Sequence, residues 1–320
     1  MAYSAPNSSA SPMASWLFRL LSSGMHFPTV VFASAEVDCG VASAENTRAA
    51  VLLFEEHGAV RLVNVFSTAF REQLRAHYSQ RYRLEMEDTA QADRRPLFTL
   101  HVEGPVAEPA YLTNPLLLPI IGALLGDDFV IGAISTVISF PGAPQQFVHR
   151  DSPSLCGDYE IDAKLPAYAL TMLVPLVDAN EETGSTRVWL GSHRAGDAQK
   201  KETLPSDSPD VAFGSVLMTD SRVLHGGSPN RSQRVRPLLY NTYHRAWFRD
   251  FSGYERRQPV SVSRRVRASL PPALAARFRV ADESDGSPEG PGMLPGLLQS
   301  ALPGALRSVV RGLDSGKESK

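Results

Sequence analysis

The sequence predicts a mainly β domain with flanking helices, and two observations indicate this fold class. From residue 129 onward, short runs rich in Val, Ile, Leu and Thr alternate with turns rich in Gly, Pro and Asp, which is typical of an all-β sandwich or barrel. Before residue 129, three stretches show helical periodicity. A double-stranded β-helix, the cupin-like jelly roll, accommodates both observations if the helices pack outside one of its sheets.

Three helices are expected, over 47–57, 67–82 and 115–125. Asn46 or Thr47 can cap the first helix and Ser67 the second, because short polar side chains accept hydrogen bonds from free N–H groups of a first helical turn. Asn114 precedes a proline, a combination that favours the start of the third helix. The expected strands are 60–65, 129–139, 145–150, 168–177, 185–190, 214–219 and 236–243.

The chain is expected to form one domain with two tails. Its 320 residues would suggest two domains at about 150 residues each, but all-β barrels often use roughly 200–250 residues as one domain. Residues 1–45 are rich in Ser, Ala and Pro and are predicted to be loosely ordered. The single domain is assigned to 46–280, and 281–320 is a tail in which 294–313 can form a short helix.

Composition excludes several function classes. A net charge of −2 gives no overall attraction to nucleic acid or to an anionic membrane, and no apolar run is long enough to span a bilayer. The two cysteines give no disulfide framework, so a reducing compartment, the cytoplasm, is expected. An organelle-targeting segment in 1–35 is the lesser alternative. Residues 221–280 hold 13 Arg and two acids, which we interpret first as a solvated surface and second as a site for an acidic substrate.

The candidate chemistry lies in Gln146-Phe147-Val148-His149-Arg150-Asp151. His149 and Asp151 are two residues apart, so their side chains leave an extended strand from the same face. His225 offers a third ligand. Two imidazoles and one carboxylate on one face of a metal are the arrangement of non-haem Fe(II) oxygenases. Eleven residues beyond His225 stands Arg236, whose guanidinium can bind a carboxylate with both arms.

Further motifs accompany these residues in a fixed order. They are Phe54-Glu55-Glu56-His57-Gly58, Val65-Phe66, Ser139-Phe140-Pro141-Gly142-Ala143, Leu173-Val174-Pro175-Leu176-Val177-Asp178, Thr183-Gly184-Ser185-Thr186 and Gly191-Ser192-His193. A His-x-Asp pair alone is a weak signal, whereas the whole series is specific. Over residues 48–250 the chain resembles the phytanoyl-CoA dioxygenase family of Fe(II)/2-oxoglutarate oxygenases, especially its microbial and fungal members that act on small metabolites.

The resemblance implies that His149, Asp151 and His225 bind Fe(II), and that 2-oxoglutarate and O2 are cosubstrates. Halogenating relatives lack the carboxylate, so the presence of Asp151 favours oxygen chemistry. We therefore expect hydroxylation, desaturation or ring formation on a small organic substrate, with 2-oxoglutarate converted to succinate and CO2. Taken singly, each of these side chains could instead satisfy an ordinary hydrogen bond of the core or a loop.

The resemblance also implies the contacts to 2-oxoglutarate. Arg236 would hold the distal carboxylate, because a buried dianion requires a permanent cation. Arg234 shares its strand face and competes, but the spacing from His225 favours Arg236. Gln146 and Thr186 match two further contacts of the fungal members. Gly227 stands where some relatives have a serine that helps bind this carboxylate.

Three alternatives stay open: a cupin-like metal enzyme that does not use 2-oxoglutarate, a non-catalytic binding protein on the same fold, and a nucleic-acid demethylase, which the overall charge disfavours. We expect a small-molecule partner, no nucleic acid and no membrane. A homodimer is allowed, since relatives of this length often dimerise. Substrate choice would reside in the loops around the barrel mouth, at 83–113, 152–166, 194–212 and 245–258.

Overall fold

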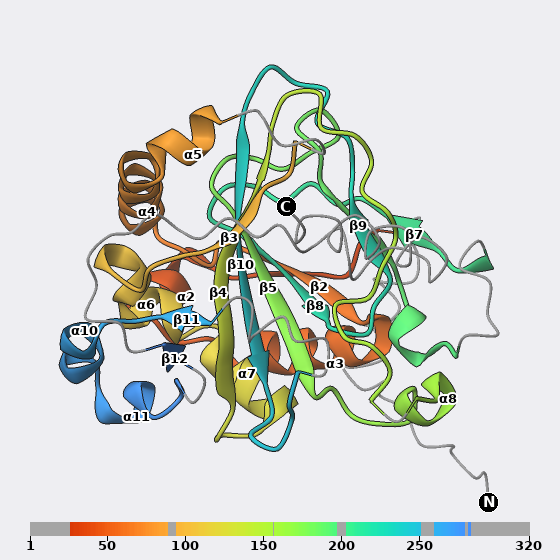
Figure 1. Ribbon diagram of the computed structural model, residues 1–320. Helices are drawn as coiled ribbons and strands as arrows, with labels where there is room; N and C mark the ends of the chain where they lie inside the picture. The colour runs from red at the N-terminus through yellow and green to blue at the C-terminus, as the bar shows by residue number, and fades with distance from the viewer. Residues whose placement is uncertain are drawn as a thin grey trace, which may run out of the picture.

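The computed structural model describes residues 26–88, 94–155, 157–196, 203–250, 259–278 and 281–282. These residues form helices, a large mixed sheet and a small antiparallel sheet (Figure 1). The large sheet has the strand order β1-β2-β8-β5-β10-β4-β3, made of Thr29–Val31, Ala59–Val63, Val216–Asp220, Ala169–Pro175, Arg236–His244, Val130–Ser139 and Leu97–Thr99. The small sheet has the order β7-β6-β9, made of Ser206–Asp207, Thr186–Trp189 and His225–Gly227.

The helices lie mainly on the side of the large sheet away from the small sheet (Figure 1). They are α2 (Ser34–Cys39), α3 (Ala44–His57), α4 (Thr68–Arg81), α5 (Arg83–Glu87), α6 (Pro109–Leu112), α7 (Leu118–Leu125), α10 (Arg264–Ser269) and α11 (Pro272–Ala275). The short helix α8 (Tyr159–Asp162) lies on the other side, and two 3-10 turns occupy Gly104–Ala107 and Ser192–Arg194. A two-stranded pair, β11 (Val260–Ser261) with β12 (Ala281–Asp282), completes the described structure.

Strand β5 shows how the layers are held together. All seven of its residues are buried, because successive side chains point to opposite faces of a strand and both faces are covered. Leu170, Met172 and Val174 join the main core under the helices. Leu173 instead joins a second cluster with Val188 of the small sheet. This double burial explains why the segment is a continuous apolar run rather than an alternating pattern.

Most predicted elements are present, with shifted ends. Ser67 caps α4 as predicted, accepting a hydrogen bond from the backbone N–H of Phe70 at 3.3 Å. The first helix begins earlier than predicted, because Ser43 and not Asn46 or Thr47 is its cap. The side chain of Asn46 instead donates to Glu36 of α2 at 2.8 Å. The prediction for the cap was wrong because a serine three residues upstream could not be ranked against Asn46 by sequence alone.

The N-terminal prediction also differs from the structure. We expected 1–45 to be loosely ordered, but β1 pairs in parallel with β2 and α2 follows it directly. Val30 and Phe32 of this segment are buried in the main core, which supplies the reason for its order. Residues 1–25 and the predicted helix at 294–313 lie outside the described residues.

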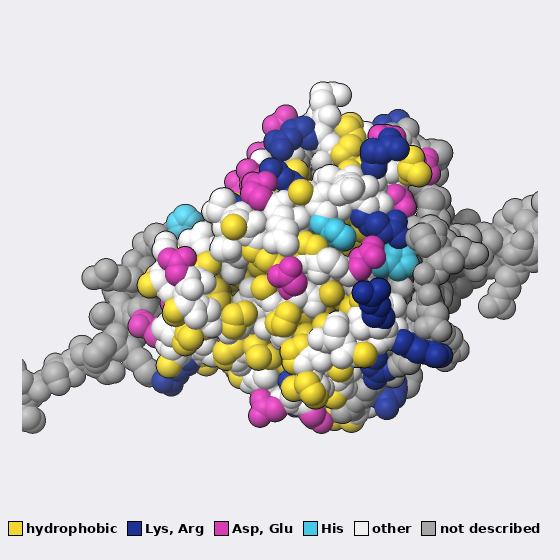
Figure 2. Space-filling model, turned by 90° about the vertical axis from the view of Figure 1, so that its left-hand side faces the viewer, with side chains coloured by type: hydrophobic (Ala, Val, Ile, Leu, Met, Phe, Trp, Pro, Cys, Tyr) yellow, Lys and Arg dark blue, Asp and Glu magenta, His cyan; other side chains and the backbone are white. Residues whose placement is uncertain are grey.

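Figure 2 shows the helical side of the molecule. Hydrophobic side chains extend across the middle of this face, and basic side chains gather toward its right-hand edge, with acidic side chains interspersed. Both signs of charge are therefore present on this face. Within the described ranges, no helix combines the length and the apolarity needed to cross a membrane.

Candidate metal centre

The three predicted metal ligands converge between the two sheets. His149 and Asp151 follow β4, and His225 begins β9. His149 and His225 form an antiparallel bridge in which each backbone N–H donates to the carbonyl of the other at 2.9 Å. The predicted strand 145–150 is reduced to this bridge. Gln146 N–H donates to Gly227 O and His149 N–H to His225 O, so the two bonds are three residues apart on one segment and two on the other. The extra residue interrupts regular pairing, as in a β-bulge.

The donor atoms of these residues lie close enough to share one ion. One ligand atom from each of His149, Asp151 and His225 lies within 4.8 Å of the others. Asp151 Oδ1 is 3.4 Å from His225 Nε2 and 3.8 Å from His149 Nε2. Nδ1 of His225 lies 3.1 Å from the carbonyl oxygen of Val223, and Nδ1 of His149 lies 3.0 Å from that of Phe147. A carbonyl at Nδ1 requires a proton there, so each Nε2 keeps its lone pair for a metal.

The charges of the three groups are linked. Burial and then the charge of His225 lower the pKa of His149 to about 4. Burial alone would lower the pKa of His225, but the charge and hydrogen bond of Asp151 raise it. Burial alone would raise the pKa of Asp151, but His225, His149 and a hydrogen bond from Thr171 bring it below its ordinary range. A carboxylate that stays ionised and imidazoles facing it form a donor set that fits Fe(II).

Thr171 is a contributor that the sequence did not reveal. Its hydroxyl donates to Asp151 Oδ2 at 2.9 Å, which leaves Oδ1 facing the two histidines. Leu173 and Pro175 alternate with Thr171 on the same face of β5 and line a cavity beside Arg236. At about 3.3 Å per residue, Leu173 lies about 7 Å along the strand from Thr171. The candidate metal centre and the cavity thus share one face of β5.

Arg236 is buried and faces this cavity, whose wall also includes Thr186, Leu217 and Leu238. Its side chain is 2% exposed, and its Nε has no hydrogen-bond partner among the described residues. The competing Arg234 is exposed. Burial, and then the charge of Arg95, lowers the pKa of Arg236 to about 9. A buried cation without a counter-ion is unfavourable by itself, so this geometry fits a carboxylate ligand.

Arg95 is a second cation at this place, and it was not predicted. Its side chain is 8% exposed and donates to the carbonyls of Pro144, at 3.0 Å from Nη2, and Ser228. It also explains the departure from the family pattern at Gly227. A Cβ there would lie 2.9 Å from Arg95 Nη1 and 3.2 Å from Gln146 Oε1, so the guanidinium occupies the space that a serine would need.

The structure brings the two remaining predicted residues to the same neighbourhood. Thr186 on β6 is paired with Gly227 on β9 and lines the cavity of Arg236. Gln146 lies on the other side of Gly227, whose backbone N–H donates to Gln146 Oε1 at 2.9 Å. Five of the six predicted site residues therefore lie on or next to β9, and Arg236 shares a cavity with Thr186. Their contact with a ligand stays a prediction.

A comparison with known families and curated proteins gives matches over the same region. A model of the phytanoyl-CoA dioxygenase (PhyH) family matches residues 54–238. Dioxygenase trt7 of Aspergillus terreus is 31% identical over 146 residues, which are 43% of this chain and 49% of that protein. The Fe(II)/2-oxoglutarate-dependent dioxygenase nvfF of Aspergillus novofumigatus is 28% identical over 147 residues, 45% of this chain and 49% of that protein. The chain spans about half the length of these curated relatives.

Solved structures show the same fold. The epimerase SnoN, in complex with Fe3+, alpha ketoglutarate and nogalamycin RO, has a TM-score of 0.51 and 14% identity, covering 64% of this chain and 85% of its own. HygX from Streptomyces hygroscopicus, with nickel and 2-oxoglutarate bound, has a TM-score of 0.51 and 20% identity, covering 63% of this chain and 89% of its own. The predicted jelly roll is confirmed by these matches, which at such identities concern the fold alone.

Proposed function

Because the chain belongs to the phytanoyl-CoA dioxygenase family, we propose that it is an Fe(II)/2-oxoglutarate-dependent dioxygenase that oxidises a small organic molecule. The observation that carries this proposal is the convergence of His149, Asp151 and His225, whose donor atoms lie within 4.8 Å of one another. Arg236 is buried, forms no ion pair among the described residues, and lines a cavity with Thr186 of β6, the strand that pairs with β9. Together they supply a site for a metal and a site for the far carboxylate of a keto acid.

Each residue has a role that follows from its chemistry. The two Nε2 atoms and Asp151 Oδ1 would hold Fe(II), and Thr171 fixes the carboxylate in place. Fe(II) with 2-oxoglutarate would supply the activation of O2, which protein side chains cannot perform. Arg236 would pair with the distal carboxylate of the keto acid, and Arg95 adds positive charge nearby.

The remaining contacts would orient the cosubstrate. Thr186 would offer a hydroxyl to the carboxylate that Arg236 binds, because both residues line the same cavity. Gln146 would offer its amide from the opposite side of Gly227. Leu173, Leu217 and Leu238 line this cavity and would exclude water from the ion pair, which strengthens the attraction between the opposite charges.

The substrate is proposed to meet an apolar surface at the metal. Phe147 is 50% exposed, and its ring lies 4.9 Å from the ring of His149, measured between centroids. An exposed aromatic ring beside a metal ligand suits a molecule that can cover it. This agrees with a small-molecule substrate, as in the SnoN structure with nogalamycin RO. Hydroxylation, desaturation and ring formation all remain within the proposal.

The decisive experiment is a titration in the absence of oxygen. Pure protein loaded with Fe(II) should develop a weak metal-to-ligand charge-transfer band when 2-oxoglutarate is added, with one ion bound per chain. The variant His225→Ala should lose both the ion and the band, and Arg236→Met should keep the ion but require much more 2-oxoglutarate. A wild-type protein that binds Fe(II) and shows no band would contradict the proposal.

A cupin-like enzyme that does not use 2-oxoglutarate is the second candidate. The buried guanidinium of Arg236, whose Nε has no hydrogen-bond partner among the described residues, disfavours it, since that enzyme would have no use for a buried cation there. Full activity of Arg236→Ala would favour it. Three further expectations stay predictions. Fractionation would test the cytoplasm as the compartment, and gel filtration with light scattering would test the homodimer. Limited proteolysis would test the domain bounds 46–280.

A further inference from the structure

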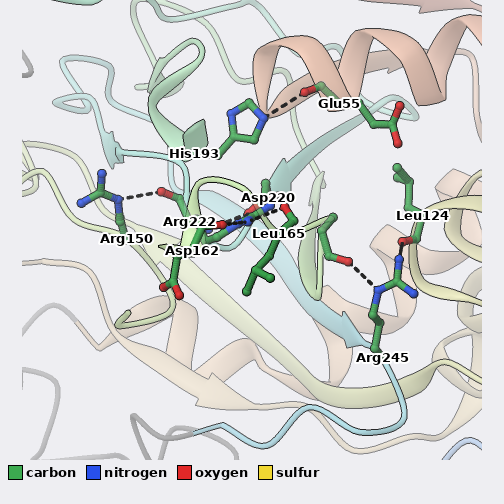
Figure 3. A network of polar contacts seen from close by, with 10 residues as sticks. Glu55, Leu124, Arg150, Asp162, Leu165, His193, Asp220, Arg222 and Arg245 are labelled. Atoms are coloured by element: carbon green, nitrogen blue, oxygen red, sulfur yellow. Dashed lines mark hydrogen bonds and ion pairs between the residues drawn. The ribbon is translucent and has the colours of Figure 1, made fainter. Parts of the chain in front are cut away.

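Arg150 stands between the two ligands His149 and Asp151, and its side chain leads away to three backbone carbonyls. Its Nε donates to the carbonyl of Arg222 at 2.8 Å. Its Nη2 donates to the carbonyls of Ser192 and Ala195, both at 3.3 Å. Figure 3 shows this hydrogen bond of Arg150 next to the contacts of Arg222.

One acceptor, on Arg222, belongs to the segment that presents the third ligand, and a second, on Ser192, belongs to a residue that is hydrogen-bonded to that segment. Arg222 precedes His225 by three residues. The hydroxyl of Ser192 accepts a hydrogen bond at 2.7 Å from the backbone N–H of Leu224, the residue directly before His225. One guanidinium therefore joins the backbone between His149 and Asp151 to the backbone that leads into His225.

The carbonyl of Arg222 is held in place because the side chain of Arg222 makes several hydrogen bonds of its own. Its Nε and Nη2 donate to the two carboxylate oxygens of Asp220 at 2.8 and 2.7 Å. Its Nη1 donates to the carbonyls of Asp162 at 2.6 Å and Leu165 at 3.0 Å (Figure 3). Bidentate pairing of this kind fixes geometry as well as charge.

Arg150 also reaches the loop that follows Asp151. Its guanidinium carbon lies 4.5 Å from the ring centre of Tyr159, at the start of α8. Asp162, at the other end of α8, accepts a hydrogen bond from the backbone N–H of Leu155 at 2.7 Å. Arg150 thus belongs to the segment of His149 and Asp151, and its side chain contacts both the His225 segment and a loop predicted to lie at the barrel mouth.

We propose that Arg150 is a positioning residue that holds the His149–Asp151 segment and the His225 segment in the register that metal binding requires. This inference rests on the proposed function, because it assumes that these three residues bind Fe(II). Backbone hydrogen bonds also join the two segments, at the bridge between His149 and His225 and from Ser152 N–H to the carbonyl of Ser221, and Arg150 adds the side-chain link between them. Loss of a group that orients metal ligands typically weakens metal affinity by about 10–100-fold.

The test compares Arg150→Gln and Arg150→Lys with wild type, using Fe(II) or Co(II) titrations without oxygen. Gln keeps a polar group but is too short to reach the three acceptors at once. Lys keeps the charge but offers a single nitrogen in place of the branched guanidinium. We expect metal affinity to fall in the order wild type, Arg150→Lys, Arg150→Gln, by about 10-fold or more for Gln. The Co(II) d–d bands should change shape, because the ligands no longer hold one geometry.

Arg71→Gln is the matched control. Arg71 also donates to a backbone carbonyl, that of Phe213 at 2.6 Å, and lies over the Phe213 ring. It is on α4, and within the described part of the chain it makes no hydrogen bond to the segments of His149, Asp151 or His225. It should lower the unfolding temperature about as much as Arg150→Gln and leave metal affinity and spectrum unchanged.

Three outcomes would overturn the inference. The first is a folded Arg150→Gln or Arg150→Lys that binds metal as wild type does, and the second is an equal loss of affinity in Arg71→Gln. A wild-type protein that binds no metal would remove the proposed function itself, and this inference with it. Because wild type, both Arg150 variants and the control are titrated together, these failures can be told apart.

Discussion

Two buried arginines, Arg222 and Arg236, stand in opposite situations. Arg222 is 4% exposed and its guanidinium donates to both oxygens of Asp220 and to two backbone carbonyls. Arg236 is 2% exposed, forms no ion pair among the described residues, and has another cation, Arg95, nearby. Both guanidinium groups are out of water, so only their partners distinguish them.

Their pKa values move in opposite directions for this reason. Burial alone would lower the pKa of Arg222, but the hydrogen bonds and charge of Asp220 raise it above the ordinary value. Burial and the charge of Arg95 lower the pKa of Arg236 to about 9. A saturated buried arginine stabilises the fold around it, whereas an unsaturated one costs stability unless a ligand supplies the missing charge. The contrast separates an arginine that is paired within the fold from one that we propose to bind a ligand.

The largest expected effect comes from breaking the saturated pair. Arg222→Met would leave the carboxylate of Asp220 buried without its cation, with only the backbone N–H of residue 222 still donating to it, and such losses cost about 3–5 kcal/mol in free energy of unfolding. Urea unfolding followed by circular dichroism measures the change. The double variant Asp220→Asn, Arg222→Met should recover part of the loss, because the unpaired charge is gone. A loss below about 1 kcal/mol in Arg222→Met would place the pair among weak surface interactions.

The next effect concerns the ligand that Arg236 is proposed to bind. A ligand at 100 times its Kd stabilises the folded state by about 2.7 kcal/mol. Wild-type protein with a redox-inert metal and 2-oxoglutarate at that level should gain this amount over the metal form alone. Arg236→Met should gain almost nothing at the same concentration. An equal gain in the free energy of unfolding in the two proteins would mean that Arg236 does not contact the cosubstrate. The difference between Arg236 and Arg222 would then say nothing about ligand binding.

The sequence predicted one of these arginines and not the other, for a physical reason. His149, Asp151, His225 and Arg236 could be found because a metal and a dianion impose ligand types at fixed spacings along two strands. Asp220 and Arg222 stand two apart in a short polar stretch between apolar residues, and nothing local shows that both are buried and paired. Their burial depends on carbonyls more than 50 residues away, such as that of Leu165.

Arg95 and Thr171 escaped prediction in a similar way. Arg95 ends a charged stretch that indicates a surface loop, and the structure places it beside Gly227, far along the chain. Thr171 is one of several β-branched or apolar residues of β5, and only the approach of Asp151 gives its hydroxyl a role. The fold class was predictable because it depends on the repeated alternation of strands and turns. Contacts between distant segments were not, because they depend on tertiary packing.

The smallest effect is also the sharpest test of the contrast. In protein freed of metal and 2-oxoglutarate by a chelator, Arg236→Met should leave the free energy of unfolding unchanged or raise it by about 1 kcal/mol, because an apolar chain replaces a buried charge without a counter-ion. Arg245→Met is the control, since Arg245 follows the opposite end of β10 and donates to the carbonyls of Ala167 and Leu124, both at 2.7 Å. That variant should lose about 1–3 kcal/mol, because it leaves two carbonyls unpaired. A loss in Arg236→Met as large as in the control would show that Arg236 is held by the apoprotein itself. A gain, together with lost 2-oxoglutarate binding, would show that the fold accepts an unfavourable charge at this position because the ligand requires it.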